Sequence, residues 1–329
     1  MVFKNDSPVL IETAIVAAVM ALLGLLGLYL MPAFYLATLL LPVPLAYLII
    51  KRNLLYGLLA LGVTALMLSF AISGIKPVFL LLLQFGPVGI IIGLLLKNKV
   101  AVDKSMAVLF FWALAVTGIN LLFSFVLSGS GLSRIATEFN TTMEQMSQFY
   151  LQSGLMDEAG RQEFLEVSQQ AGRLVRELLP GGMAVWTIII TIFTYFITRH
   201  LARGLGYNVS GNLRFTEWQL PWYSIWLVIA GLALTMAGEE FSLELVGIAG
   251  KNILYISVFI FLILGTAVLA YFIRVWKIST PAKIFIIIAM VLYLPLAAAI
   301  ILSLGVVDPV ANLRRLPVDN DMVSKGGSG

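Results

Sequence analysis

Nine apolar stretches, each close to the length of a membrane-spanning helix, dominate this sequence. A bilayer crossing needs about 20 mostly apolar residues, so a chain of 329 residues with nine such stretches leaves little material for a soluble core. The stretches are Leu10–Leu30, Met31–Ile50, Leu54–Ser73, Pro77–Leu96, Met106–Leu127, Met183–Thr198, Trp222–Ala237, Ile253–Ile273 and Ile284–Val306. The sequence therefore predicts an all-α, polytopic helical membrane protein with about nine transmembrane helices.

The composition supports this class and excludes others. Hydrophobic residues make up 60% of the chain and charged residues 12%, whereas soluble domains have about 45–50% and about 25%. So high an apolar content excludes a disordered chain. The chain has no cysteine and one histidine, His200, which excludes thiol catalysis, thiolate zinc sites and multi-histidine metal sites. We expect no cofactor and no metal.

The distribution of charge predicts the topology. With the N-terminus in the cytoplasm, the inside connections carry twelve basic and three acidic residues, and the outside segments carry nine basic and thirteen acidic residues. Connections rich in Lys and Arg stay on the cytoplasmic side. We therefore expect a multi-pass protein of the cytoplasmic membrane whose C-terminus is extracytoplasmic. The apolar stretch after Lys4 is too long for a signal peptide, so the first helix should be retained.

Two polar segments interrupt or follow the apolar stretches. Residues 128–180 carry seven acids and four arginines, with apolar residues at helical spacing, which predicts an extracytoplasmic amphipathic helical hairpin. It separates transmembrane helices 1–5 (residues 1–127) from helices 6–9 (181–307). The hairpin is either a helix pair resting on the bilayer or a lid over an outward-facing cavity. We expect residues 308–329 to be a disordered tail, and its last four residues resemble an artificial linker.

A stripe of small residues lies on the first helix. Ala14, Ala17, Ala18 and Ala21 fall at positions i, i+3, i+4 and i+7, and such stripes let membrane helices approach closely. The stripe serves either internal packing or the docking of a partner subunit. Glu12, one turn into the same helix, is either an interfacial carboxylate or a functional one.

Three side chains in the fourth and fifth helices are candidate ligand contacts. They are Gln84, Trp112 and Asn120. The nearby Gly86-Pro87 pair predicts a kink that frees backbone carbonyls, as in helices that line substrate sites. Amides also join neighbouring helices, so interhelical bonding is the alternative for Gln84 and Asn120.

Further patterns predict helix breaks and interfaces rather than chemistry. Pro42 and Pro44 should break the second helix, and Pro295 the ninth. Gly89 and Gly93 form a GxxxG contact face. Aromatic residues near the seventh helix predict an interfacial belt, namely Trp218, Trp222 and Trp226. Basic residues at the end of the sixth helix are expected to set the topology, namely Arg199, His200 and Arg203.

Catalytic motifs are missing from the sequence. It contains no P-loop, no His-Glu-x-x-His and no Gly-x-Ser-x-Gly, and few acids lie within the apolar stretches. We therefore expect a protein that is not an enzyme and has no nucleic-acid partner.

Several short motifs resemble a known family. Three of them are similar to motifs of the YybS-like family of bacterial membrane proteins. They are Leu41-Pro42-Val43-Pro44-Leu45-Ala46-Tyr47 followed by Lys51-Arg52-Asn53, the run Phe85-Gly86-Pro87-Val88-Gly89 to Gly93 ahead of Lys97, and Trp218-Gln219-Leu220-Pro221. This family has no assigned function. The resemblance covers about residues 8–305 and implies a bacterial cytoplasmic membrane protein.

The N-terminal half also resembles the S components of energy-coupling factor transporters. These six-helix proteins capture small ligands from outside, their alanine-rich first helix meets a membrane coupling subunit, and separate subunits hydrolyse ATP. The alanine stripe of the first helix matches that motif type. Residues 128–180 and the three helices after residue 200 depart from a minimal S component, and no ligand-specific motif matches.

These observations lead to one expected function and one alternative. The first is a non-enzymatic membrane protein that binds a small ligand from the extracytoplasmic side, as an S-component-like specificity subunit with a membrane coupling subunit as partner. The alternative is a cell-envelope scaffold that binds an envelope protein through the external hairpin. Both place the chain in the lipid bilayer.

Overall fold

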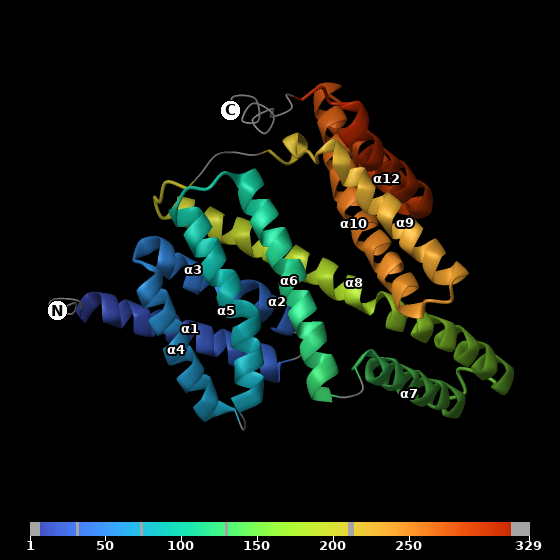
Figure 1. Ribbon diagram of the computed structural model, residues 1–329, viewed down its shortest axis with the longest axis horizontal. Coiled ribbons are helices and arrows are strands. Elements are labelled where there is room, and N and C mark those ends of the chain that lie inside the picture. The colour runs from blue at the N-terminus through green and yellow to red at the C-terminus, as the bar shows by residue number, and fades with distance from the viewer. Residues whose placement is uncertain (1–6, 31–32, 73–74, 129–130, 210–213, 317–329) are drawn as a thin grey trace. The chain divides into compact units, whose positions relative to one another are not determined.

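The computed structural model describes residues 7–30, 33–72, 75–128, 131–209 and 214–316. In this part of the chain every regular element is a helix, which confirms the predicted all-α class (Figure 1). Eight helical stretches among the described residues, with Phe34–Lys51 counted as one, are long and apolar enough to cross a membrane, and two shorter apolar helical stretches cover Leu81–Lys97 and Thr280–Leu292. The protein is therefore a polytopic membrane protein. The far end of the tail, residues 317–329, lies outside the described residues.

The chain forms two compact units. The first comprises residues 1–131 and 183–212, and the second comprises residues 132–182 and 213–329. The helices of the first unit are α1 (Ser7–Tyr29), α2 (Phe34–Leu40), α3 (Pro42–Lys51), α4 (Leu54–Ala71), α5 (Ile75–Lys97), α6 (Val102–Ser128) and the second part of α8 (Glu158–Gly204).

Local sequence explains how the helices of the first unit begin and break. The second apolar stretch consists of α2 and α3, which meet at Leu41, so the break predicted from Pro42 and Pro44 is confirmed. A proline at the start of a helix is favourable because its missing N–H is not needed there. Asn53 starts α4, and its side chain accepts a hydrogen bond from the Tyr56 N–H.

The core of the first unit lies between α1, α3, α4 and α5. Leu45, Leu48 and Ile49 of α3, and Leu41 just before it, are almost fully buried there. The GxxxG face of α5 packs on α3: a Cβ on Gly89 would lie 2.8 Å from the Pro42 carbonyl oxygen, and one on Gly93 would lie 2.9 Å from the Ile49 Cβ. The predicted glycine contact face is thus confirmed as a contact within the chain. α5 continues as a helix through Pro87.

The second unit contains the hairpin and the C-terminal helices. Its elements are α7 (Gly131–Gln152), the first part of α8, 3₁₀ turns at Phe215–Glu217 and Trp222–Ser224, α9 (Ile225–Glu240), α10 (Glu244–Val275), α11 (Thr280–Leu292) and α12 (Leu294–Ala311). Figure 1 shows α9, α10 and α12 packed side by side. In the hairpin, α7 packs on α8 through Tyr150 and Phe164, whose ring centroids are 6.4 Å apart.

The hairpin differs from the sequence expectation in one respect. Its second helix and the sixth transmembrane stretch form a single helix of 47 residues, α8, which includes Pro180. The proline lacks an N–H and would weaken the helix at this turn. Side-chain bonds from α10, described below, supply partners for the backbone at this point.

The ninth apolar stretch is also different from the expected single helix. It consists of α11 and α12, which meet at Tyr293, where the backbone leaves the helical region (φ −114°, ψ 47°). Pro295 follows two residues later, at the start of α12. The predicted break at Pro295 is therefore confirmed, but it divides the stretch into two helices of 13 and 18 residues.

Candidate functional sites

The three candidate ligand residues lie on neighbouring helices of the first unit. Gln84 is on α5, Trp112 and Asn120 are on α6, and all three are half-buried. No hydrogen bond between described residues joins them, and neither of the two hollows described for this structure includes them. The structure thus places them in one unit without bringing them together into one site.

Two buried donors in the first unit lack partners among the described residues. They are the indole Nε1 of Trp112 on α6 and the hydroxyl of Tyr195 on α8. Tyr195 is fully buried, and α6 and α8 meet through the hydroxyls of Thr117 and Thr187, 3.5 Å apart. Buried donors are almost always hydrogen-bonded, so each such group needs an explanation, such as a bound water or ligand.

Sequence reasoning missed Tyr195, although a signal for it exists. Threonines recur along α8 at positions 187, 191, 194 and 198, a spacing that puts them on one helix face. The last three are buried, and the Thr194 hydroxyl donates to the Leu39 carbonyl at 2.9 Å. A polar stripe of this kind on an apolar helix indicates an inward-facing surface.

The alanine stripe of α1 is divided between two faces. Ala17 and Ala21 are buried against α4, where the Thr64 hydroxyl donates to the Ala17 carbonyl at 3.2 Å and Leu68 packs near Ala21. Ala14 and Ala18 are exposed. Internal packing therefore accounts for half of the stripe, and only Ala14 and Ala18 remain on the surface of the chain.

Glu12 belongs to a charged cluster at the end of α3. Its carboxylate accepts hydrogen bonds from Lys51 and from Arg52, the latter at 2.8 and 3.0 Å. Lys97 of α5 donates to the carbonyls of Ile49 and Arg52, where the last turn of α3 leaves carbonyls free. These contacts join α1, α3 and α5, so they favour the interfacial, structural interpretation of Glu12.

Aromatic rings lie beside this cluster, and Arg199, which was expected to be a topogenic cation, is buried. The Tyr47 ring lies 5.7 Å from the Lys51 ammonium and 6.1 Å from the Tyr207 ring. Burial, and after it the neighbouring Tyr47, raises the pKa of Tyr207 above its ordinary value, so its hydroxyl stays protonated at neutral pH. Arg199 is 6% exposed, whereas a purely topogenic cation would be solvated.

An asparagine of α10 binds the turn of α8 that contains Pro180. Its Oδ1 accepts from the Gly181 N–H at 2.6 Å, and its Nδ2 donates to the Glu177 carbonyl at 2.7 Å. Asn252 is 8% exposed, so these bonds are made out of water. The neighbouring Lys251 pairs with the Glu177 carboxylate at 2.8 Å. Together they attach α8 to α10 at a weak point of its backbone.

The start of the expected tail is ordered. Arg314 is 2% exposed and pairs with Asp308 at 2.7 Å, and its guanidinium also donates to the carbonyls of Thr216 and Trp218. A buried arginine needs such a full set of partners. Residues 308–316 are therefore part of the second unit, in contrast to the expectation of a disordered tail from residue 308.

This cluster also corrects the expected course of the last stretch. The Tyr271 hydroxyl, near the end of α10, donates to the Arg314 carbonyl at 3.2 Å, and α11 starts beside the same end of α10, where Lys283 and Lys277 line one hollow. The chain thus leaves this end in α11 and returns to it in α12. A single crossing by residues 284–306 would have carried Arg314 to the opposite end.

The acidic residues in the described part of the chain do not cluster as metal ligands. Among the described residues, no group of three or more histidine or carboxylate side chains is placed to hold a metal ion. Glu239 and Glu240 end α9 and are exposed.

The fold and these sites define a polytopic α-helical membrane protein. A family model described as "Predicted membrane protein (DUF2232)" matches residues 18–309, and the chain belongs to this family. No curated protein and no solved structure matches the chain.

Proposed function

We propose that the first unit binds a small ligand from the extracytoplasmic side, and that the protein is a non-enzymatic specificity subunit similar to an S component. The observation that carries this proposal is the pair of buried donors, Trp112 Nε1 and Tyr195 hydroxyl, that have no partner among the described residues. They lie on α6 and α8, two helices of the same compact unit.

The chemistry of these donors indicates the class of ligand. An indole N–H and a phenol O–H both donate to oxygen, so a ligand that satisfies them must present acceptor oxygens. A small, mostly apolar molecule with one or two carbonyl or carboxylate oxygens would satisfy them. Leaving two such donors unbonded costs about 1–3 kcal/mol each, which favours an occupant.

The first unit supports the transporter part of the proposal. Residues 1–131 and 183–212 form one compact unit, in which α2 and α3 share one apolar stretch, as expected from the resemblance to six-helix S components. Ala14 and Ala18 are exposed on α1, so a coupling subunit would meet this half of the stripe. The YybS-like resemblance, which gives no function, is compatible with this role.

Mass spectrometry of the purified protein tests ligand binding. We expect a stoichiometric small molecule to be released on denaturation, and to be lost from the double variant Trp112→Phe/Tyr195→Phe, which removes both donors and keeps both rings. The matched control is Tyr223→Phe/Trp226→Phe, which changes exposed side chains on the second unit. Equal ligand content in the two variants would contradict the proposal, as would a protein that releases no small molecule.

Co-purification tests the coupling subunit. Ala14→Leu/Ala18→Leu should abolish the association of α1 with a second membrane protein, because the larger side chains prevent close helix approach. The control is Ala107→Leu/Ala115→Leu, which places the same change on exposed positions of α6. Association that survives the α1 change would exclude docking through this face.

A second candidate function rests on the hairpin. Phe149, Leu155, Val167 and Leu174 of this region are 58–74% exposed, as a helix pair that binds an envelope protein requires. Phe149→Ser/Val167→Ser should release such a partner while the small-molecule content stays unchanged. The opposite pattern, a lost small molecule and a retained partner, would exclude the hairpin as the binding surface.

A further inference from the structure

Three basic side chains line one hollow at the α10–α11 connection. Arg274 and Lys277 come from the end of α10, and Lys283 comes from the first turn of α11. The hollow has a volume of about 420 Å³, and its remaining lining is Ala270, Ile273 and Ile287. It therefore combines positive charge with an apolar wall.

The backbone of the connection brings the three cations together. α10 ends in a turn in which Lys277 adopts a left-handed conformation (φ 49°) and donates its N–H to the Arg274 carbonyl at 3.2 Å. α11 then begins at Thr280, with Pro281 in its first turn. Because only residues 276–279 separate the two helices, Lys283 returns to the end of α10 that carries Arg274.

The charge of this hollow is not neutralised by the described part of the chain. No acidic residue occurs in the sequence between Glu244 and Asp308, and Asp308 itself is paired with the buried Arg314. Among the described residues no carboxylate pairs with the three cations of the hollow. Trp276, 68% exposed beside them, is the residue type that marks the level of lipid headgroups.

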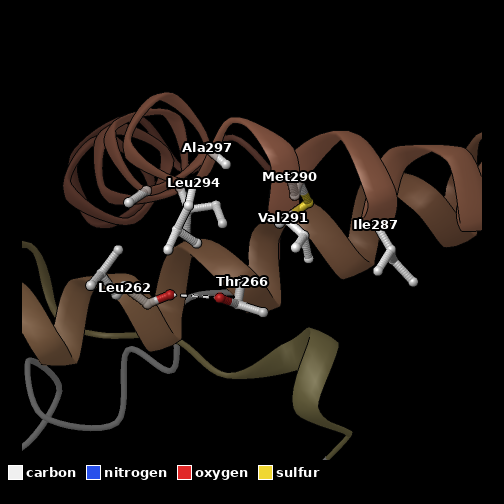
Figure 2. A pocket seen from close by; sticks show the side chains of 9 residues that line it. Leu262, Thr266, Ile287, Met290, Val291, Leu294 and Ala297 are labelled. Atoms are coloured by element: carbon white, nitrogen blue, oxygen red, sulfur yellow. Dashed lines mark hydrogen bonds between the residues drawn. The ribbon is translucent and has the colours of Figure 1, made fainter. Parts of the chain in front are cut away.

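A second hollow continues the first into the apolar part of the unit. It has a volume of about 320 Å³ and shares Ile287 with the basic hollow. Figure 2 shows its lining, with Ile287 and Val291 of α11 on one side and Leu262 of α10 on the other. The Thr266 hydroxyl already donates to the Leu262 carbonyl at 2.8 Å, so it offers no free donor to a ligand.

We propose that the two hollows together bind one acidic phospholipid. The phosphate lies against Arg274, Lys277 and Lys283, and an acyl chain follows Ile287 into the apolar hollow. A basic pocket between helices at the membrane surface is suited to an anionic headgroup. A soluble phosphate compound would use the same cations, but it would have no use for the apolar hollow beyond Ile287.

Native mass spectrometry of the whole protein tests the headgroup site. The probes are phosphatidylglycerol and phosphatidylcholine with identical acyl chains. We expect Lys277→Gln/Lys283→Gln to weaken phosphatidylglycerol retention about 30-fold, or about 1 kcal/mol for each basic residue near the surface, with little effect on phosphatidylcholine.

The chain contains a matched control pair. Lys99 also ends a helix in a left-handed conformation (φ 51°), and Lys104 lies in the first turn of α6, as Lys283 does in α11. Both are exposed, and neither lines the hollow. Lys99→Gln/Lys104→Gln removes the same charge and should leave retention unchanged. An equal loss in both double variants would overturn the proposal, because it would show only the general attraction of a basic surface.

A third variant separates lipid from soluble phosphate. Thr266→Phe fills the apolar hollow and leaves the cations in place. It should weaken the retention of long-chain phosphatidylglycerol at least fivefold. The retention of a phosphatidylglycerol with six-carbon acyl chains should be unaffected. Competition by inorganic phosphate as strong as that by the lipid, together with no effect of Thr266→Phe, would identify a soluble phosphate as the ligand and overturn the lipid assignment.

Discussion

Gly265 of α10 and Gly305 of α12 lie backbone against backbone. A Cβ on Gly265 would overlap the Ile301 carbonyl oxygen, and one on Gly305 would overlap the Phe261 carbonyl oxygen. Each glycine therefore lies over a peptide group of the other helix. Close packing of this kind contributes to helix association in a membrane, where lipid provides no hydrophobic driving force between helices.

Alanine at either glycine should separate α10 from α12. We expect Gly265→Ala or Gly305→Ala to lower the free energy of unfolding by about 3 kcal/mol, the upper range for overpacking, because backbone cannot move aside as a side chain can. Thermal unfolding in detergent measures this. Gly62→Ala is the control, because a Cβ there meets no atom within 4 Å. Equal stability of Gly62→Ala and Gly265→Ala would contradict the close contact.

Removal of the Asn252 amide should loosen α8 near Pro180. Asn252→Leu keeps the volume but leaves the Gly181 N–H and the Glu177 carbonyl without this partner, at a cost of about 2 kcal/mol. Hydrogen exchange should become faster at residues 177–182. The control is Ser303→Ala, which removes only a bond to the Ala299 carbonyl of its own helix and should leave that exchange unchanged. Unchanged exchange at residues 177–182 in Asn252→Leu would mean that the amide does not hold α8.

The buried pair of Asp308 and Arg314 should show strong coupling. Asp308→Ala leaves a buried guanidinium without its carboxylate and should cost about 3–5 kcal/mol. Adding Arg314→Met removes the uncompensated charge and should restore part of this stability. A double-mutant cycle from denaturant unfolding gives the coupling energy. Additive effects of the two changes would mean that the residues do not interact.

The side of the membrane on which the described chain ends can be measured directly. The sequence has no cysteine, so single cysteines report one position each. We expect Arg315→Cys and Lys277→Cys to react with an impermeant thiol reagent from the same side and Glu240→Cys from the other, because α11 and α12 start and end beside the end of α10. Labelling of Arg315→Cys from the same side as Glu240→Cys would contradict this arrangement and support a single crossing by residues 284–306.

Parts of the sites followed from the sequence, and others could not. The sequence indicated Trp112 as an aromatic side chain beside a helix predicted to be kinked. Whether its indole N–H has a partner depends on neighbours from other helices, which the sequence does not show. The four alanines form one stripe by spacing, yet α4 covers only Ala17 and Ala21. The spacing of residues in one helix does not predict which part of its small-residue face another helix will cover.

The sequence by itself determined the membrane class, the helical fold and the breaks at Pro42 and Pro295. The class and the fold follow because an apolar segment in lipid must satisfy its own backbone hydrogen bonds. The breaks follow because proline lacks a backbone N–H. The tertiary structure alone decided the return of α12 to the end of α10 and the burial of Arg314, and it brought Asn252 to Pro180. The packing of α12 on α10 depends on Gly265 and Gly305, glycines 40 residues apart in the chain that permit two backbones to touch. Hydropathy is calculated for each stretch by itself and contains no information about such contacts. It therefore predicted a single crossing for residues 284–306.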